Sequence, residues 1–258
     1  MIALLKTSER TNNLSHINNY VFQRHLFAYK AVSKDLLREK KVLELGCGEG
    51  YGMELLSPLT DLYLAVDKKR PAGICFNNNR QFTHCQLPWL SHIPGNSFDT
   101  ILCFQVIEHI KNDHLLLKEI KRVLKPGGSL LLTTPNKLTS LTRNPFHIRE
   151  YLPSQMQALI ASGFNTWSVQ GIYGNDTVMK YYGENKRSVE RITRYDVLNL
   201  QYTLPAFLLK GVYSLLNNYN RFTLARKTPD ITASINYVDF YLNELSDACL
   251  DYFVIAMK

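Results

Sequence analysis

A short apolar segment that runs directly into a glycine-rich turn constrains the fold of this chain most. Residues 41–52 have the sequence KVLELGCGEGYG. The apolar positions are typical of a parallel strand that is buried on both faces. The glycines predict a loop with unusual backbone angles, where bare backbone lets a ligand approach closely. A strand, a glycine turn and a helix together predict a nucleotide-type pocket at the carboxyl end of the first strand.

Strand and helix patterns alternate along most of the chain, which predicts an α/β fold with a parallel sheet and helices on both faces. Helices are expected over Asn18–Glu39, Tyr51–Ser57, Asn112–Leu124 and Pro153–Ser162. Further strands are expected over Leu62–Asp67, Gln81–Cys85, Phe98–Phe104, Ser129–Thr134, Phe164–Ile172 and Asp251–Met257. Pro126-Gly127-Gly128 is expected to close the third of these helices.

The segment between the last two expected strands is far longer than the usual connection of about 2–6 residues. It is mostly helical in pattern and rich in tyrosine and asparagine. We therefore expect a core of residues 1–173 and 248–258, which includes the N-terminal helix. Residues 174–247 are expected to form an inserted helical cap on the substrate side.

The net charge of +8 is concentrated in the expected cap. Nine basic and three acidic residues lie between Thr177 and Lys227. This excess fits either an anionic partner, such as a lipid surface or an acidic substrate, or a solvated helical surface. In the first case, Leu204–Leu216 would be an interfacial helix that makes peripheral contact with a membrane.

Composition gives no sign of a membrane span or of export. No run of about eighteen apolar residues is present. Met1–Leu5 is too short for a signal-peptide core. The five cysteines are scattered and odd in number, which favours free thiols over disulfides or zinc. A cytoplasmic protein is expected.

The spacing of the glycine loop argues against the common phosphate-containing ligands. A dinucleotide loop has the pattern Gly-x-Gly-x-x-Gly, but here the third glycine, Gly50, comes one position early and Tyr51 follows it. Glu44 lies two residues before the loop, where a carboxylate disfavours pyrophosphate and favours an ammonium group. Asp67 ends the second strand, where a carboxylate accepts both ribose hydroxyls. The pattern predicts a ligand with an amino group and a ribose but no phosphate.

These features resemble class I S-adenosylmethionine-dependent methyltransferases, of the small-molecule group that includes ubiquinone-type O-methyltransferases. The motifs that carry the resemblance are Val42–Gly50, Asp67, Asn96–Asp99, Val106–Ile110 and Glu119–Gly128. They occur in the family's order over roughly residues 40–170. The resemblance implies a Rossmann-like sheet of seven strands, the last of them antiparallel, and S-adenosylmethionine as the cofactor.

The resemblance also implies which residues hold the cofactor. Residues in and before the glycine loop would hold the methionine amino group, the acid of the second strand would bind the ribose, and the end of the fourth strand would line the methionine arm. The residues are Glu44, Gly46, Cys47, Gly48, Asp67, Phe104 and Gln105.

The adenine contact departs from the family pattern. Family members often carry an aspartate after the third strand, whereas the candidates here are Cys85, Gln86 and Leu87. Glutamine or a backbone amide would then replace the carboxylate. On the N-terminal helix, Arg24 is a candidate to grip a carboxylate of the ligand, or else it is a packing or surface residue.

Methyl transfer to oxygen usually needs a base, and histidine suits neutral pH. His109 follows Glu108 after the fourth strand, and His147 lies in the loop after the fifth, where similar methyltransferases carry a histidine. Each of the two histidines can equally be structural. Together with Glu150 these side chains could ligate a metal, but their spacing is not diagnostic, and no metal is predicted.

The sequence therefore predicts methyl transfer from S-adenosylmethionine to a small-molecule or lipid-like acceptor, at oxygen. The alternative is a catalytically silent scaffold or regulatory subunit that binds the same cofactor. A nicotinamide dehydrogenase is disfavoured by the glycine spacing and by Glu44. A nucleic-acid partner is not expected, because Phe104–Ile107 stands where amino-methylating nucleic-acid enzymes carry Asp/Asn-Pro-Pro-Tyr/Phe and no nucleic-acid module is present. The identity of the acceptor molecule and the oligomeric state are not predicted.

Overall fold

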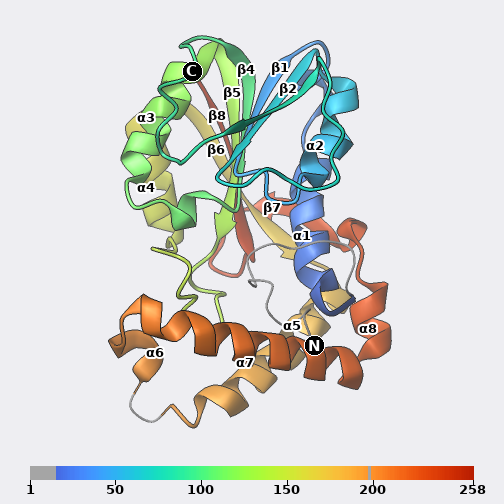
Figure 1. Cartoon of the computed structure of the whole chain (residues 1–258). Helices are drawn as coiled ribbons and strands as arrows, with labels where there is room; N and C mark the ends of the chain where they lie inside the picture. The colour runs from blue at the N-terminus through green and yellow to red at the C-terminus, as the bar shows by residue number, and fades with distance from the viewer. Residues whose placement is uncertain (1–15, 197–198) are drawn as a thin grey trace. The chain divides into compact units, whose positions relative to one another are not determined.

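The computed structural model describes residues 16–196 and 199–258 (Figure 1). The chain divides into two compact units. The sheet unit contains residues 28–139, 149–173 and 242–258, and the helical unit contains residues 16–27, 140–148 and 174–241. Compared with the expected cap of residues 174–247, the helical unit gains two earlier segments and loses residues 242–247. The substrate-side role of this unit stays a prediction.

One mixed sheet of eight strands forms the centre of the sheet unit, in the order β3-β2-β1-β4-β5-β8-β6-β7. The strands are β1 (Lys41–Leu45), β2 (Leu62–Asp67), β3 (Arg80–His84), β4 (Phe98–Phe104), β5 (Leu124–Pro135), β6 (Thr166–Gly174), β7 (Phe240–Glu244) and β8 (Asp251–Met257). The α/β prediction is confirmed, but the count of seven strands was wrong by one. The additional strand, β7, lies at the edge of the sheet beyond β6.

The order of the strands creates a switch point at β1. This strand pairs in parallel with β2 on one side and with β4 on the other, and Leu43 faces Leu64 and Ile101 across the two pairings. The chain adds β2 and β3 on one side of β1, and then β4 and β5 on the other side, so the winding direction reverses at β1. Ligands of such sheets bind at the carboxyl ends of the strands beside this reversal. Strand β8 is antiparallel to both of its neighbours, β5 and β6, as the resemblance implied.

Helices cover both faces of this sheet. Figure 1 shows α3 (Asp113–Val123) and α4 (Pro153–Gly163) on one side of it and α2 (Tyr51–Leu56) on the other. Both faces of β1 are buried, since Val42, Leu43 and Leu45 are at most 1% exposed. Each such side chain contributes about 1.5–3 kcal/mol when it leaves water, so the strand that carries the glycine loop is held firmly.

Two expected helix ends were wrong. Helix α1 (Asn19–Lys30) stops well before Glu39, because the Ser33 hydroxyl accepts the backbone N–H of Asp35 and starts a separate 3-10 turn. Helix α3 ends at Val123 without a glycine cap. Gly127 has φ 75° and lies in an irregularity of β5, where the pairing with β4 shifts register.

The helical unit contains α5 (Asp176–Thr193), α6 (Leu200–Thr203), α7 (Ala206–Lys227) and α8 (Pro229–Ser234). The start of α1 joins them, since the Tyr20 ring stacks on Tyr181 at 4.8 Å and the Asn19 amide donates to two backbone carbonyls near the end of α8. Helix α7 begins at Ala206 because Pro205 precedes it.

Helix α7 carries exposed apolar side chains, among them Phe207 (73%), Leu215 (59%) and Tyr219 (64%). Its contact with anionic lipid stays a prediction. Among the helices of residues 16–196 and 199–258, none combines the length and the apolar character that a membrane span requires.

Candidate functional site

The glycine loop lies at the switch point and is shaped by three left-handed glycines. Gly46, Gly48 and Gly50 have φ values of 71°, 55° and 85°. A Cβ on Gly46 would lie 2.6 Å from Val106 Cγ2, and one on Gly50 would lie 2.9 Å from Ile74 Cγ1. No atom lies within 4 Å of a Cβ built on Gly48. The first and third glycines are thus needed for packing, and the middle one leaves space for a ligand.

Asp67, at the end of β2, holds this loop in place. One carboxylate oxygen accepts the backbone N–H of Gly48 at 2.9 Å, and the other accepts the N–H of Lys69 at 3.0 Å. The side chain is only partly buried. An anionic oxygen pair beside open space over Gly48 could accept the two hydroxyls of a ribose, and this role of Asp67 stays a prediction.

Glu44, in β1, is a buried carboxyl with one unsatisfied oxygen. The side chain is 1% exposed, and Oε1 accepts the Tyr29 hydroxyl at 2.6 Å. Among the residues that the structure describes, neither Oε2 nor the nearby Tyr63 hydroxyl makes a hydrogen bond of ordinary geometry, although this hydroxyl is close enough to stabilise the carboxylate. A buried polar atom left in this state costs about 1–3 kcal/mol. A ligand group that donates hydrogen bonds, such as an ammonium, would remove that cost.

Burial raises the pKa of Glu44 from 4.5 to about 7, against the opposing effect of the Tyr29 and Tyr63 hydroxyls. The carboxylate of Asp67 adds to the rise by charge repulsion. An ammonium group beside Glu44 would favour its ionised form and lower this pKa. Binding of a cation beside Glu44 would therefore be coupled to the loss of a proton.

Gly52 and Tyr29 support Glu44, and the sequence analysis missed both. A Cβ on Gly52 would lie 2.1 Å from Tyr29 Cε1 and 2.8 Å from Glu44 Oε1. Gly52 lies inside α2, where glycine lowers helix stability by about 1 kcal/mol relative to alanine. A glycine within an expected helix was therefore the sequence signal that this position needs to lack a side chain. Phe104, 7% exposed, packs edge-on against the Tyr29 ring at 4.9 Å. Its predicted contact with the methionine arm stays a prediction.

Gln105 turns the chain sharply at the end of β4. It has φ 55°, although it is not a glycine. Its backbone N–H donates to the Thr133 carbonyl at 2.9 Å, and its side-chain amide donates to the Thr133 hydroxyl at 3.3 Å. A left-handed residue of this kind costs about 1–3 kcal/mol and is typical of functional sites. The turn places Gln105 at the switch point, beside the carboxyl end of β1.

The three candidates for the adenine edge differ in exposure. Cys85 is 4% exposed, and its backbone N–H donates to the Asp67 carbonyl at 3.0 Å. Its thiol donates to the Trp89 carbonyl, and burial raises the pKa of this thiol. Gln86 is exposed and Leu87 is half-buried. Trp89, which the sequence analysis did not single out, is 61% exposed in the same loop.

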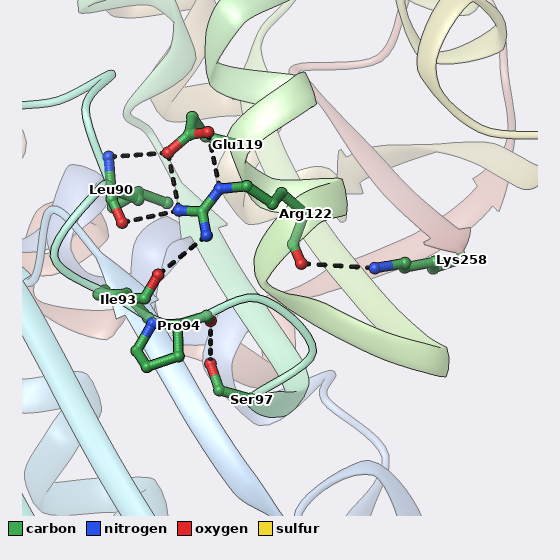
Figure 2. A network of polar contacts seen from close by, with 7 residues as sticks. All are labelled: Leu90, Ile93, Pro94, Ser97, Glu119, Arg122 and Lys258. Carbon is green, nitrogen blue, oxygen red and sulfur yellow. Dashed lines mark hydrogen bonds and ion pairs between the residues drawn. The ribbon is translucent and has the colours of Figure 1, made fainter.

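A polar network anchors this loop to α3 (Figure 2). The Arg122 guanidinium donates to the carbonyls of Leu90 at 2.8 Å and Ile93 at 3.0 Å. Glu119 accepts from Arg122 at 2.8 Å and from the backbone N–H of Leu90 at 3.2 Å. Lys258 donates to the Arg122 carbonyl at 3.4 Å. The hydrogen bonds from Arg122 lower the pKa of Glu119, so the pair is ionised at neutral pH.

Arg122→Ala is expected to lower the free energy of unfolding by about 1–2 kcal/mol, because two loop carbonyls and one carboxylate lose their donor. Chemical denaturation measures this change. Lys118→Ala, an exposed position on the same helix, is the matched control and should change stability by less than about 0.5 kcal/mol. Equal stabilities of the two variants would show that the network does not anchor the loop.

Glu108 and His109 lie in the sheet unit, in a 3-10 turn after β4. Glu108 is 1% exposed, and Oε2 accepts the Thr134 hydroxyl at 2.9 Å. Oε1 lies 4.0 Å from His109 Nε2, and the histidine side chain is 32% exposed. The buried carboxylate and the imidazole are thus close neighbours, and the base role of His109 stays a prediction.

His147 and Arg24 belong to the helical unit. Asn144 donates its amide to His147 Nε2 at 2.9 Å, and the Asn144 carbonyl oxygen accepts the backbone N–H of Phe146, which fixes the amide orientation. This nitrogen of His147 is therefore an acceptor already in use. The Arg24 guanidinium lies 5.5 Å from the centre of the Tyr20 ring. The predicted roles of the two residues, as a base and as a carboxylate ligand, stay predictions.

Comparisons with known sequences show which family this chain belongs to. A family model described as a methyltransferase domain matches residues 16–192. A probable S-adenosylmethionine-dependent methyltransferase of Mycobacterium tuberculosis is 33% identical over 182 residues, which are 66% of this chain and 65% of that protein. The mitochondrial ubiquinone biosynthesis O-methyltransferase of Rattus norvegicus is 26% identical over 137 residues, which are 49% of this chain and 39% of that protein.

A solved structure supports the same fold. A methyltransferase of Thermotoga maritima, described as a possible histamine N-methyltransferase, has a TM-score of 0.55 and 16% identity, and covers 94% of this chain and 98% of its own. This likeness concerns the fold alone. The family match spans most of the described sheet strands and the whole glycine loop. The chain belongs to the methyltransferase-domain family.

Proposed function

We propose that this chain binds S-adenosylmethionine at the glycine loop and transfers its methyl group to a small-molecule or lipid-like acceptor, at oxygen. The observation that carries the proposal is the unsatisfied, buried Oε2 of Glu44 beside a loop fixed by Asp67. The cofactor offers an ammonium for the first group and a ribose for the second. The name of the rat relative, an O-methyltransferase of ubiquinone biosynthesis, supports oxygen as the accepting atom.

Bound S-adenosylmethionine would supply a methyl group activated by a sulfonium. The residues of this chain would then have to align the acceptor with that carbon and exclude water, which together can lower a barrier by several kcal/mol. The Glu44 carboxylate would hold the amino group and Asp67 the ribose diol. His109 would take the proton of the acceptor hydroxyl, and the Glu108 carboxylate 4.0 Å away would stabilise the resulting imidazolium.

The pKa of Glu44 predicts a pH dependence of stability in the cofactor-free protein. The folded pKa of about 7 lies above the ordinary value of 4.5. The stabilisation linked to the protonated carboxyl is therefore complete below pH 4.5 and is lost as the pH rises through about 7. The loss amounts to about 3 kcal/mol at most, at 1.36 kcal/mol per pKa unit. Urea denaturation of wild type and of Glu44→Gln at pH 5 and pH 8 isolates this contribution.

Glu44→Gln is expected to remove this contribution, since glutamine does not titrate. Burial lowers the pKa of His25 from 6.5 to about 3, which gives an opposite trend over the same pH range in both proteins and cancels in their difference. Glu54→Gln, at an exposed position of α2, is the matched control and should keep the contribution of Glu44. The wild-type protein should also release protons when it binds S-adenosylmethionine at pH 6.5, as calorimetry in two buffers of different ionisation enthalpy would show. Identical pH profiles for Glu44→Gln and wild type would contradict a raised pKa at this position.

An assay of turnover separates the enzyme from the silent scaffold. Wild-type protein incubated with S-adenosylmethionine and simple quinol or catechol acceptors should form S-adenosylhomocysteine, with a gain of about 14 daltons in the acceptor (one added CH₂). His109→Gln should lower the rate and leave cofactor binding unchanged. Tight cofactor binding without transfer to any acceptor, including components of cell extracts, would favour the scaffold.

A further inference from the structure

The helical unit contains a cavity of about 430 Å³. Its walls come from the C-terminal half of α5, from α6, from α7 and from the segment 142–145. Aliphatic side chains dominate the lining, among them Val189, Ile192, Leu204, Leu209 and Leu216. The volume falls within the range of about 300–1,000 Å³ that is usual for small-molecule pockets.

The two charged residues in the lining are both engaged in hydrogen bonds with the backbone. Arg143 donates to the carbonyls of Gln201, Tyr202 and Leu204, at 3.0–3.3 Å. Asp196 accepts two backbone N–H groups at the start of α6, at 2.6 and 3.0 Å. Both charges therefore hold the wall together. The backbone already satisfies both charged groups, so the lining does not require a charged ligand, and its largely apolar surface favours a neutral one.

Asn220 supplies a polar atom that lacks a partner. It lines the cavity and is 5% exposed. Its amide Nδ2 donates to Asn185 Oδ1 at 2.7 Å, which fixes the orientation of the side chain. Among the described residues, its Oδ1 has no hydrogen-bond partner. A buried acceptor in an apolar wall calls for a donor, because leaving it unpaired costs about 1–3 kcal/mol.

We propose that this cavity is a binding site for a neutral, mainly hydrocarbon ligand that carries one hydroxyl or amide donor, such as a long-chain alcohol. The hydrocarbon would fill the aliphatic lining, and the donor would pair with Asn220 Oδ1. The site lies entirely in the helical unit. It is independent of the proposed methyl transfer, so its test needs neither cofactor nor turnover.

The test uses the full chain and N-phenyl-1-naphthylamine, a neutral dye that fluoresces in apolar surroundings. The dye should bind saturably, and 1-decanol should displace it. Decyl methyl ether has a similar chain but no donor, so it should compete about three- to tenfold less well, the value of one hydrogen bond. Asn220→Leu should remove the difference between alcohol and ether, with circular dichroism to confirm that the variant is folded.

Leu209→Trp fills the cavity and should weaken dye binding by about tenfold or more. Leu215→Trp introduces the same side chain on the same helix, at a position that is 59% exposed and outside the lining, and should leave the affinity unchanged within about twofold. Equal losses in the two variants would place the dye on the exposed face of α7 and overturn the proposal. So would an absence of saturable binding, or equal competition by alcohol and ether.

Discussion

Asp67→Ala is expected to weaken the binding of S-adenosylmethionine by about 100-fold or more. The reason is that the ribose would lose two hydrogen bonds to a carboxylate, each worth about 1.5–3 kcal/mol. The carboxylate also accepts the N–H groups of Gly48 and Lys69. The substitution therefore loosens the loop itself and adds to the loss.

Calorimetric titration of the variant measures this effect. Asp61→Ala is the matched control, because Asp61 is an exposed acid next to the opposite end of β2. Its affinity for the cofactor should equal that of wild type. Asp67→Asn should fall between the two, since an amide oxygen still accepts hydrogen bonds but carries no charge. Unchanged affinity in Asp67→Ala would mean that the ligand does not lie at the end of β2.

Gly52→Ala is expected to lower the free energy of unfolding of the sheet unit by about 2–3 kcal/mol, the upper part of the range for overpacked sites. The new methyl group would lie 2.1 Å from Tyr29 Cε1 and 2.8 Å from Glu44 Oε1. The Tyr29 ring is wedged against Phe104, so it cannot move away without disturbing the core. Displacement of Glu44 should also remove the binding of the cofactor amino group.

Gly163→Ala provides the contrast within the same unit. A Cβ at this position, at the end of α4, would make ordinary contacts of 3.6 Å or more with Leu117. It should leave stability unchanged or raise it by up to about 1 kcal/mol. Denaturation curves of the two variants test the difference. Equal stability of Gly52→Ala and Gly163→Ala would show that α2 can shift away from Tyr29 at little cost.

The sequence predicts the glycine loop and the strand before it well, because neighbouring residues determine both. Val42, Leu43 and Leu45 indicate a buried strand because a glycine turn follows them at once. The glycines have the left-handed backbone that they were expected to supply. Asp67 lies beside Gly48 because parallel strands bring their carboxyl ends to one edge of a sheet. The pairing of β1 with β2 fixes this proximity.

The features that the sequence analysis did not predict depend mostly on contacts between segments that are distant in the sequence. Tyr29 lies fifteen residues before Glu44, and no local pattern marks it as the partner of a buried carboxyl. Arg122 and the loop carbonyls of Leu90 and Ile93 are about thirty residues apart, so the network that holds the loop after β3 could not be foreseen. Strand β7 has only five residues and lies within a mostly helical segment, so its pattern is too short to stand out.

The helical periodicity of the sequence does not show to which compact unit two of the expected site residues belong. Arg24 and His147 lie within residues 1–173, all of which were expected to belong to the core. The structure places both in the helical unit. A helical pattern specifies an amphipathic face, but it does not specify which compact unit that face packs against.

Calorimetric titration of the full chain with S-adenosylmethionine, and separately with NAD⁺ and 5′-methylthioadenosine, tests the central claim most directly. We predict one saturable site for S-adenosylmethionine and none for NAD⁺. 5′-Methylthioadenosine keeps the ribose but lacks the amino group, so it should bind at least about tenfold more weakly. Saturable binding of NAD⁺ without binding of S-adenosylmethionine would contradict an amino-and-ribose site without phosphate contacts.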